Sequence, residues 1–554
     1  MRPEGRDDLS SLYFKYPQFK SFKSSHKTEE KIPVVIVGAG PVGLTAALSL
    51  ARYGVRSVVL EAKNTFNDGS RAICLSRSSM HIFEQIGVEK SFLQKALQWT
   101  KGRCYYGAEE ICSFEMPNLK DEKYFPMYNI QQQYTEQFLW SAAEKNELIE
   151  IRWGSKLLNV KQMDENTTVN VECENGNYDL LSKYLIAADG ARSATRNNLG
   201  LSLKGENFEG RYAIADVRVS MQKPTERIAI FEPTSDVGAT VLVHRQPDDI
   251  WRIDWQLKEG QSEKDVLKEE NIKDIVSKVL IELNCHEDWE LEWWSIYSAN
   301  TLCLDNYRNG SVFFVGDSAH IVPIFGVRGL NNGLADAYNL GWKLGYVHNN
   351  MAPKSLLDTY SLERRGATLD VFKNATKSAR FMAPHSRGWR LVREAVLSLA
   401  KSNIFAQPFT NPRQMSPYTY RENLNTFVNE QEKKFNSGIV FGDLCIDLKL
   451  NGGGYLLDRA GKGFFGIIFL DIIEDPRGVD IESQCQLFDP NFRIIQIYLN
   501  SQKPDDLNFY LAKKLDAKIG TFYLLRPDYH VGGRWRDLDI AEILQALKIQ
   551  MGKL

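Results

Sequence analysis

Apolar β-branched residues open the most distinctive stretch of this 554-residue chain, VVIVGAGPVGLTAALSLARYGVRSVVLE at 34–61. The run from Val34 to Val37 has the residue types of a buried parallel strand. An Ala- and Leu-rich segment with helical character follows, and a second β-branched run from Val55 to Leu60 predicts a neighbouring strand. The hydrophobic pattern therefore predicts a βαβ unit in an α/β fold.

Three glycines separate the first strand from the helix in the spacing G-x-G-x-x-G. We expect Gly38 to permit a tight turn, Gly40 to let a pyrophosphate approach the backbone, and Gly43 to let the helix pack against the strand. The phosphates would lie on the free N–H groups and the positive dipole end of the helix. Glu61 ends the second strand, where an acid can accept hydrogen bonds from an adenosine ribose. Strand, glycines, helix, strand and acid in this order predict a dinucleotide site.

Another short strand of the buried type is predicted at 184–188, in the sequence YLIAADGARSATRNNLG. It ends at Asp189 and Gly190, and Arg192 follows at the start of the next turn or helix. One interpretation is an ordinary strand-to-helix turn with Asp189 as the helix cap. The other interpretation is a second part of the nucleotide site, and this segment alone leaves both open.

A third strand-and-loop pattern occurs at 310–344, GSVFFVGDSAHIVPIFGVRGLNNGLADAYNLGWKL. A buried strand at 312–315 is terminated by Gly316 and Asp317. A loop with Pro323, Gly326, Gly329, Asn331 and Gly333 precedes a helix that carries Leu334. So many glycines before a helix N-terminus indicate that the backbone approaches an anionic or electron-rich group closely. An Asp at the end of the strand can accept hydrogen bonds from sugar-like hydroxyls.

From 208 to 304 the pattern is mostly two-residue alternation, interrupted by a helical segment at 262–283. The stretch WRIDWQL at 251–257 places its large apolar residues on one face and Arg252, Asp254 and Gln256 on the other. Such a sheet can roof a substrate pocket. The alternative is a sheet with one face on a core and the other in water.

Charge and cysteine spacing exclude several classes of function. The formal net charge of −2 gives no electrostatic reason to bind nucleic acid or an anionic membrane surface. The eight cysteines are scattered without C-x-x-C or zinc spacing, which predicts reduced thiols in a cytoplasmic enzyme and no metal site. We expect no membrane span, because the longest apolar run is interrupted by the glycines of the turn, and no signal peptide.

The two ends of the chain differ from its middle. Residues 1–31 are polar and Lys-rich with interleaved aromatics, which is typical of an extended surface arm or of a disordered tail. A turn-rich segment begins at 405 and predicts a linker over 405–434. Residues 435–554 have the pattern of a small α/β unit with three strand candidates. Its GKGFFG at 461–466 matches the glycine spacing, but we reject it because no strand precedes it and a strand follows it.

Together these motifs resemble the FAD-dependent aromatic hydroxylases, the single-component flavoprotein monooxygenases. GAGPVG with its acid resembles the ADP-binding fingerprint, AADGARSATR resembles the internal Asp-Gly motif, and VGDSAHIVPIFGVRGLNNG resembles the Gly-Asp motif with the flavin-ring loop. NIQQQYTEQFL at 129–139 and LLDTYSLERR at 356–365 are further family-like stretches. YLLRPDYHVGGRW at 523–535 is similar to the end of the C-terminal domain in the phenol hydroxylase and 3-(3-hydroxyphenyl)propionate hydroxylase branch. The resemblance covers nearly the whole chain.

The resemblance implies an α/β fold with a Rossmann-type FAD-binding domain at 32–404, following the N-terminal arm. An antiparallel substrate-domain sheet would be inserted at about 102–128 and 205–304. After the linker, 435–554 would be a thioredoxin-like domain without redox chemistry, since C-x-x-C is missing. Carried over by motif, the residues that would contact FAD are Gly38, Gly40, Pro41, Gly43, Glu61, Ala62, Arg71, Gln132, Asp189, Arg192, Gly316, Asp317, Pro323, Gly329, Leu330 and Asn331.

The implied activity is hydroxylation of a phenolic or other activated aromatic compound, with tightly bound FAD, O₂, and NADH or NADPH as a transient reductant. In the family an oxygen atom is transferred through a flavin C4a-hydroperoxide. A tailoring oxygenase that hydroxylates or epoxidises a larger polycyclic or quinone-like metabolite is the alternative on the same scaffold. The oligomeric state is left open, with a homodimer as one possibility.

A base near the substrate would assist by deprotonating a phenol. The candidates are His244, Arg252 and Asp254 on the sheet, and His320, which is close to the flavin in the family pattern. Arg328 departs from the family pattern; beside the flavin it could pair with an anionic group of the substrate or with the protein's own carboxylates. Each of them is also compatible with a structural role. A flavin dehydrogenase or disulfide reductase would show a second nucleotide fingerprint or a redox cysteine pair, and neither is present. A protein that only binds ligands would have damaged flavin-loop residues, and in this sequence these residues are intact.

Overall fold

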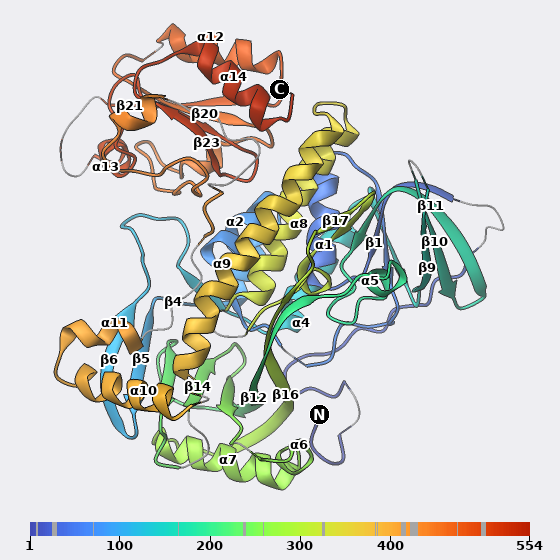
Figure 1. Ribbon diagram of the computed structural model, residues 1–554, viewed down its shortest axis with the longest axis vertical. Coiled ribbons are helices and arrows are strands. Elements are labelled where there is room, and N and C mark those ends of the chain that lie inside the picture. Colours follow the sequence, from blue (N-terminus) through green and yellow to red (C-terminus); the bar gives the residue numbers. More distant parts are fainter. Residues whose placement is uncertain are drawn as a thin grey trace.

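The strand predicted at Val34 lies at the centre of the first sheet of the computed structural model (Figure 1). β1 (Glu30–Val37) pairs in parallel with β2 (Ser57–Glu61) on one side and with β11 (Gly176–Ala187) on the other. The order across the sheet is β17-β18-β11-β1-β2-β8. The remaining strands are β8 (Ile149–Trp153), β9 (Lys156–Gln162), β10 (Thr167–Cys173), β17 (Arg308–Asn309) and β18 (Val312–Phe314).

The structure describes residues 1–6, 9–24, 30–69, 71–163, 166–235, 240–258, 260–323, 327–382, 384, 386–410, 417–420, 430–473, 475–499, 503 and 506–553. No helix in these ranges is long and apolar enough to cross a membrane.

Close helix packing supports the first sheet. α1 (Pro41–Arg52) packs along α8 (Gly329–His348). A Cβ on Gly341 would lie 2.4 Å from the Ser49 Cβ, and one on Gly345 would lie 2.5 Å from the Tyr53 Cβ. These glycines therefore let the two helix backbones approach, which brings the start of α8 to the glycine turn before α1. The other helices of this region are α4 (Gln132–Glu144), α5 (Ala194–Asn198) and α9 (Asp358–Met382).

The second sheet has the order β19-β16-β12-β15-β14-β13-β5-β6. Its neighbours are antiparallel except β13 and β5, which are parallel. The strands are β5 (Lys101–Tyr106), β6 (Glu109–Glu115), β12 (Lys204–Val219), β13 (Arg227–Phe231), β14 (Thr240–Arg245), β15 (Ile250–Gln256), β16 (Trp289–Cys303) and β19 (His320–Ile321). The alternating pattern predicted from the sequence is thus a sheet. All of its strands except β19 come from the two predicted segments.

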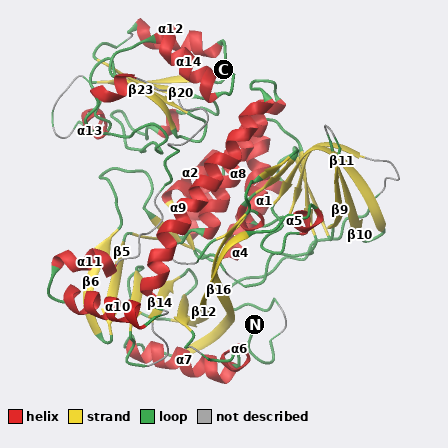
Figure 2. Ribbon diagram, viewed as in Figure 1, coloured by secondary structure: helices red, strands yellow, loops and turns green. Residues whose placement is uncertain are grey.

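Helix α7 (Glu269–Glu282) covers one face of the second sheet, with the short α6 (Glu263–Val266) before it (Figure 2). Trp251, Ile253 and Trp255 of β15 belong to the same apolar cluster as Ile272 and Val276 of α7. The predicted helical segment and the predicted apolar face therefore pack on each other, as the alternation in WRIDWQL requires. The charged residues of β15 consequently lie on the opposite face.

A small third sheet, β3-β7-β4, lies between the first two. Ser76 caps the helix that follows β3, by accepting a hydrogen bond from the backbone N–H of Ser79. The elements of this region are β3 (Cys74–Ser76), α2 (Arg77–Gln85), α3 (Glu89–Lys95), β4 (Leu97–Trp99) and β7 (Met127–Asn129).

The C-terminal part contains a four-stranded mixed sheet of order β21-β20-β22-β23. The sequence indicated three strands; the fourth, β23 (Val531–Trp535), was missed because it contains two glycines. The rejected motif GKGFFG leads into β20, so the strand expected after it is confirmed. The other elements are β20 (Phe465–Leu470), α12 (Pro476–Gln486), β21 (Arg493–Tyr498), α13 (Leu507–Lys514), β22 (Phe522–Leu525) and α14 (Ile540–Gln550).

Buried charges join this C-terminal part to α8 and α9. The Glu363 carboxylate accepts hydrogen bonds from Nη1 and Nη2 of Arg526, each at 2.8 Å, and from Nζ of Lys343 at 2.7 Å. Arg526 also donates to Asp528 at 2.7 Å. All four side chains are buried, so the contact depends on complete pairing of these charges.

The predicted linker 405–434 lies partly outside the described residues, since 411–416 and 421–429 are not among them. Its described parts include helical turns: η3 (Ile404–Ala406), α11 (Gln407–Thr410) and η4 (Glu430–Lys434). The helix α10 (Arg387–Ala400) precedes them. The start of the predicted linker is therefore helical rather than an extended turn-rich segment.

Candidate functional site

The glycine turn between β1 and α1 shows why each glycine is required. Gly38 has φ +105°, and a Cβ there would lie 2.5 Å from the carbonyl O of Ala188. A Cβ on Gly43 would lie 2.0 Å from the Gly38 carbonyl O. The nearest atom to a Cβ on Gly40 would be Asn67 Nδ2, at 4.0 Å. Two glycines are therefore imposed by packing, whereas the third faces open space at the place where a pyrophosphate would approach the backbone.

The N-terminus of α1 is free to bind an anion. Gly40 is the N-cap residue and has no side chain to cap the helix, and Pro41 follows it. The unpaired N–H groups of the first turn and the helix dipole favour a phosphate there. Glu61 accepts hydrogen bonds from the backbone N–H of Ala39 and of Lys63, each at 3.0 Å, so its carboxylate lies beside the glycine turn. Ala62 follows it in the chain.

Asp189 accepts hydrogen bonds from the start of α5, whose N-cap residue is Ser193. One carboxylate oxygen accepts a hydrogen bond from Ser193 Oγ at 2.6 Å, and the other accepts from the N–H and hydroxyl of Thr195, each at 2.9 Å. Its backbone lies beside the glycine turn, since Asp189 N would be 3.2 Å from a Cβ on Gly38. Arg192 is exposed. The N-cap is therefore Ser193 rather than Asp189, which supports the same turn, and a role of Asp189 near the pyrophosphate stays a prediction.

Arg196 connects this loop to the Gly-Asp motif. Its Nη2 donates to the Ala191 carbonyl at 2.7 Å and its Nη1 donates to the Ser318 carbonyl at 3.0 Å. Gly316 has φ +59°, and Asp317 follows it in the same short 3₁₀ turn. The two motifs that are far apart in the sequence therefore lie side by side.

Asp317 is accessible to solvent, yet protein surrounds it on several sides. Burial raises the pKa of its carboxyl above the ordinary value, while the charges of His320 and Arg71 oppose the rise. Arg71 is itself exposed. An accessible carboxylate beside an accessible guanidinium suits the polar middle of a dinucleotide. Asp317 could accept hydrogen bonds from hydroxyls, and Arg71 could bind a phosphate.

At the N-terminus of α8, the Asn331 side chain is fully engaged. Its Nδ2 donates to the carbonyls of Cys74 and Val327, at 3.0 and 2.7 Å. Its Oδ1 accepts from the Ser76 N–H at 2.8 Å and from Ser79 Oγ at 2.6 Å. The Asn331 side chain is therefore committed to contacts within the protein, and the backbone N–H groups of this first turn can face a ligand. The predicted positions Gly329, Leu330 and Asn331 form this turn; Pro323 is buried, and 324–326 lie outside the described residues.

Asp336, which the sequence did not reveal, orients both halves of this loop. Its Oδ2 accepts a hydrogen bond from the Gly316 N–H at 3.0 Å and lies 2.6 Å from His320 Nε2. Its Oδ1 accepts from Arg364 Nε at 2.7 Å. Burial opposes ionisation, but His320 and Arg364 hold the pKa of Asp336 below its ordinary value. His320 therefore positions the loop through Asp336, and Arg364 belongs to the LERR stretch noted in the sequence.

Gln132 anchors the loop that carries Arg71. Its Oε1 accepts a hydrogen bond from the Ala72 N–H at 3.2 Å, and its Nε2 donates to Glu136 Oε1 at 2.8 Å. Glu136 in turn accepts from the Asn67 backbone N–H at 2.9 Å. Burial raises the pKa of Glu136 to about 6. The predicted flavin contact Gln132 thus lies beside the predicted contact Arg71.

The second sheet presents a row of polar side chains to this region. The strand register forms this row across four neighbouring strands. Arg227 of β13 pairs with His244 of β14, and His244 pairs with Arg252 of β15. Arg252 in turn pairs with Asp216 of β12. Arg252 donates to both carboxylate oxygens of Asp216, at 2.7 and 2.8 Å. Its Nη1 donates to the Arg71 carbonyl at 3.0 Å. The catalytic candidates and the cofactor candidates therefore meet at one place.

Two of the candidates have shifted pKa values. Burial, with help from the charges of Arg227 and Arg252, lowers the pKa of His244 well below its ordinary value, so that the imidazole is neutral. Asp254 lies on the same face of β15 as Arg252, two residues further along. Burial raises the pKa of Asp254 to about 7. A carboxyl that titrates near neutrality can accept a proton from a phenol.

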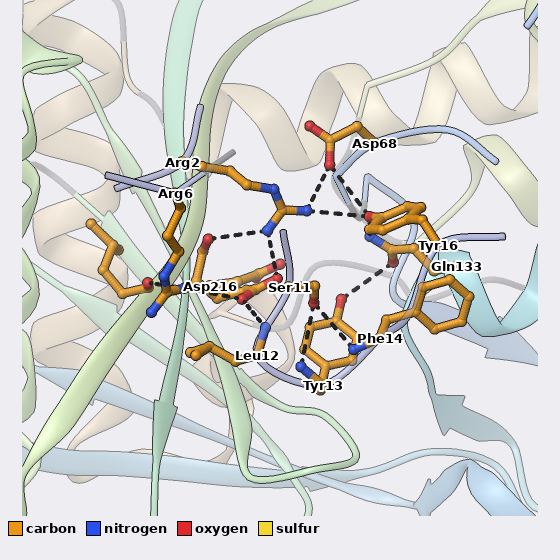
Figure 3. Close-up of polar contacts among 12 residues, drawn as sticks. Arg2, Arg6, Ser11, Leu12, Tyr13, Phe14, Tyr16, Asp68, Gln133 and Asp216 are labelled. Carbon is orange, nitrogen blue, oxygen red and sulfur yellow. Dashed lines mark hydrogen bonds and ion pairs between the residues drawn. The ribbon is translucent and has the colours of Figure 1, made fainter. Parts of the chain in front are cut away.

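The N-terminal segment covers one edge of this polar row (Figure 3). Nη1 of Arg2 donates to Glu292 of β16 at 2.8 Å and its Nη2 to Asp68 at 2.7 Å. Tyr13 donates to Gln133 Oε1 of α4 at 3.3 Å. The segment therefore ties the second sheet to the loop before Arg71. Of the two interpretations of 1–31, the described part fits an ordered arm with buried aromatics, Phe14 and Tyr16.

Three further residues of the site were missed: Asp216, Arg227 and Asp336. Each is a charged residue within a mostly apolar stretch, in YAIADVRV, ERIAIF and GLADAYNL respectively. A charged residue on the buried side of a strand or helix is the signal that could have identified them. In the described part of the chain His81, Glu84 and Asp447 also lie close enough together to be candidate metal ligands, but Lys123 ion-pairs with Glu84.

Comparison with known proteins agrees with this geometry. A family model described as FAD binding domain matches residues 31–375. The chain is 27% identical over 528 residues to a 3-(3-hydroxy-phenyl)propionate/3-hydroxycinnamic acid hydroxylase of Mycobacterium sp. (strain JLS), covering 92% of this chain and 90% of that protein. It is 25% identical to the hydroxylase of the same name from Escherichia coli (strain SMS-3-5 / SECEC), covering 79% and 78%.

Solved structures have the same fold. The flavin-dependent monooxygenase PieE, solved in complex with FAD and substrate, superposes with a TM-score of 0.77 at 22% identity, covering 95% of this chain and 99% of that one. The p-nitrophenol 4-monooxygenase PnpA from Pseudomonas putida DLL-E4 gives a TM-score of 0.60 at 24% identity, covering 70% and 100%. Aklavinone-11 hydroxylase, in a ternary complex with FAD and aklavinone, gives 0.73 at 20% identity, covering 95% and 100%.

Proposed function

Since the chain belongs to the FAD binding domain family and is an FAD-dependent monooxygenase, we propose that it hydroxylates a phenolic or other activated aromatic compound. The observation that carries the proposal is the hydrogen bond from Arg252 to the Arg71 carbonyl. It joins the polar face of the second sheet to the loop that would hold the cofactor. A substrate on that face would therefore lie close to the loop that contacts the bound FAD.

The residues present fit FAD. The free N-terminus of α1 and the open side of Gly40 suit the pyrophosphate, and Glu61 suits the adenosine ribose. Asp317 and Arg71 suit the central part, and the backbone N–H groups that open α8 suit the electron-rich edge of the ring. When bound, FAD would supply the redox chemistry that places one atom of O₂ on the substrate.

The protein groups around the substrate would position it and move its proton. Asp254, with a pKa of about 7, is the base that this geometry favours, because its carboxylate form is populated near neutrality. Removing the phenolic proton makes the ring more nucleophilic. His244 stays neutral and can donate or accept one hydrogen bond. Arg252 is held by Asp216 and would act by fixing the Arg71 loop rather than as a base.

Several finer features belong to the same proposal. NADH or NADPH would reduce the flavin transiently, as the absence of a second glycine fingerprint from the sequence suggests. The second sheet would be the inserted substrate domain, and the C-terminal part a thioredoxin-like domain; its strand order β21-β20-β22-β23 with helices between strands supports the latter. A cytoplasmic location and a homodimer remain predictions from the sequence.

A substrate screen tests the proposal. Purified protein with FAD is mixed with NADH or NADPH and a panel of phenols, aromatic acids and larger polycyclic or quinone-like compounds. We expect at least one simple aromatic compound to accelerate NAD(P)H oxidation and to yield a product one oxygen atom heavier by mass. Acceleration by polycyclic compounds alone would favour the alternative of a tailoring oxygenase. Acceleration without a heavier product would contradict hydroxylation of that compound.

A further inference from the structure

Arg227 carries a buried positive charge, and two nitrogens of its guanidinium lack an acceptor among the described residues. The residue is 3% exposed, and within the described ranges its Nε and Nη1 have no hydrogen-bond partner. A guanidinium does not lose its charge under ordinary conditions, although burial lowers the pKa of Arg227. Leaving a charge buried without a partner is strongly unfavourable. Its partner in the working protein is therefore expected to be a ligand.

The place of Arg227 in the sheet points to the substrate. It stands opposite His244 in the polar row, on the same face as the Arg252 that contacts the Arg71 loop. The charge of Arg227 also opposes the rise in pKa that burial gives the Cys74 thiol of β3. The Cys74 carbonyl accepts the hydrogen bond from Asn331 at the start of α8. Arg227 is therefore separated from the flavin-ring loop by the single strand β3.

The other charges on this face do not neutralise Arg227. Arg252 already binds both carboxylate oxygens of Asp216, so this acid is committed to a different guanidinium. Asp254 is close enough to affect Arg227 electrostatically, but no ion pair joins the two among the described residues. Burial also raises the pKa of Asp254 to about 7, which weakens it as a permanent counter-ion. The polar row therefore has a net positive charge at its β13 end, where Arg227 lies.

We propose that Arg227, with His244 beside it, is the subsite that holds the carboxylate of an aromatic acid, so that the protein selects aromatic acids over neutral aromatics. The planar fork of a guanidinium matches a carboxylate, and a neutral imidazole can donate one further hydrogen bond to it. This inference rests on the proposed function, because it names the class of substrate at the same site.

Binding, rather than turnover, tests the subsite. The probes are 3-(3-hydroxyphenyl)propionate and its methyl ester, titrated into protein with FAD while the flavin absorbance is followed. We expect the wild type to bind the acid at least 10-fold more tightly than the ester. Arg227→Gln should weaken binding of the acid by about 10- to 100-fold, with little change for the ester and unchanged FAD content. Arg227→Lys should retain part of the preference.

Arg245→Gln is the matched control. Arg245 is next to His244 in β14, but it lies opposite Trp251 on the other face and donates to the Lys223 carbonyl at 2.8 Å. It should leave the ratio of acid to ester affinity unchanged. Without ligand, Arg227→Gln and Arg227→Met should melt no lower than the wild type, since they remove an unpaired buried charge; a lower melting temperature would show a structural role.

The outcomes separate this inference from the proposed function. An unchanged acid preference in Arg227→Gln, or a wild type that does not prefer the acid, overturns the subsite even if aromatic compounds are hydroxylated. A wild type that binds the acid through Arg227 but hydroxylates no member of the aromatic panel supports the subsite and contradicts the proposed function.

Discussion

Asp216 accepts two hydrogen bonds from Arg252, so the guanidinium nearest the Arg71 loop already has a partner. Two parallel charge-assisted bonds fix the plane of the guanidinium. This leaves its third nitrogen, Nη1, directed at the Arg71 carbonyl, and the second sheet is thereby held at a fixed distance from the cofactor loop. The same pairing leaves Arg227 as the charge on this face that a ligand can satisfy.

The glycine turn gives a prediction that separates ligand binding from folding. Gly40→Val should reduce FAD affinity at least 10-fold with little change in stability, because its side chain would enter the open space intended for the pyrophosphate. Gly43→Ala is the matched variant, and it should destabilise the protein itself, because its Cβ would collide with the Gly38 carbonyl. Flavin absorbance and the thermal unfolding of the protein without FAD measure the two effects. Equal loss of stability in both variants would refute the distinction.

Asp317 should contribute to FAD retention. Asp317→Ala should weaken FAD binding by about 10- to 100-fold, the loss expected for hydrogen bonds to a charged group. The measurement is the FAD dissociation constant from fluorescence quenching. Asp305→Ala, at an exposed acid paired with Lys204, is the control and should bind FAD normally. Unchanged retention in Asp317→Ala would remove this residue from the cofactor site.

Asp254 should make stability fall as pH rises. Burial raises its pKa in the folded state to about 7, from an ordinary value of 3.8, so the folded protein binds the proton more tightly. The stabilisation is complete below pH 3.8 and is lost as pH rises through about 7. Between pH 5 and pH 7.5 the wild type should lose about 2 kcal/mol more free energy of unfolding than Asp254→Asn, measured in urea. If the free energy of unfolding depended on pH in the same way for both proteins, Asp254 would have an ordinary pKa in the folded state.

Glu363 should hold the C-terminal part against α8 and α9. Glu363→Gln leaves Arg526 and Lys343 buried with an incomplete partner, which typically costs about 3–5 kcal/mol. We expect faster proteolysis between 405 and 434 and an earlier unfolding transition. Glu432→Gln, at a more exposed partner of Arg534, should cause a much smaller change. Equal behaviour of the two variants would argue against the buried network.

Local sequence patterns predicted much of this fold because they have local causes. The β-branched run at Val34 and the glycine spacing after it depend on residues close in the chain. The alternation in WRIDWQL also correctly placed Arg252 and Asp254 on a common face. The strand β23 escaped because Gly532 and Gly533 have no side chain to show the alternation, although neighbouring strands hold their backbone.

The polar contacts between distant segments could not be predicted in the same way. Asp336 joins His320 to Arg364, and Arg227 meets His244 only after the strands have paired. The sequence identified His320 and His244 but not their partners, because strand register is a tertiary property. The FAD contacts named from the motifs remain predictions that the variants above test.

The central claim is that this protein places one oxygen atom from O₂ on an aromatic compound. The most direct test is turnover under ¹⁸O₂ with FAD, NAD(P)H and an aromatic substrate from the screen, followed by mass spectrometry of the product. We predict that the product gains a single ¹⁸O atom and that none comes from labelled water. A product whose added oxygen comes from water, or NAD(P)H oxidation that yields only hydrogen peroxide with every aromatic compound tested, would contradict the account.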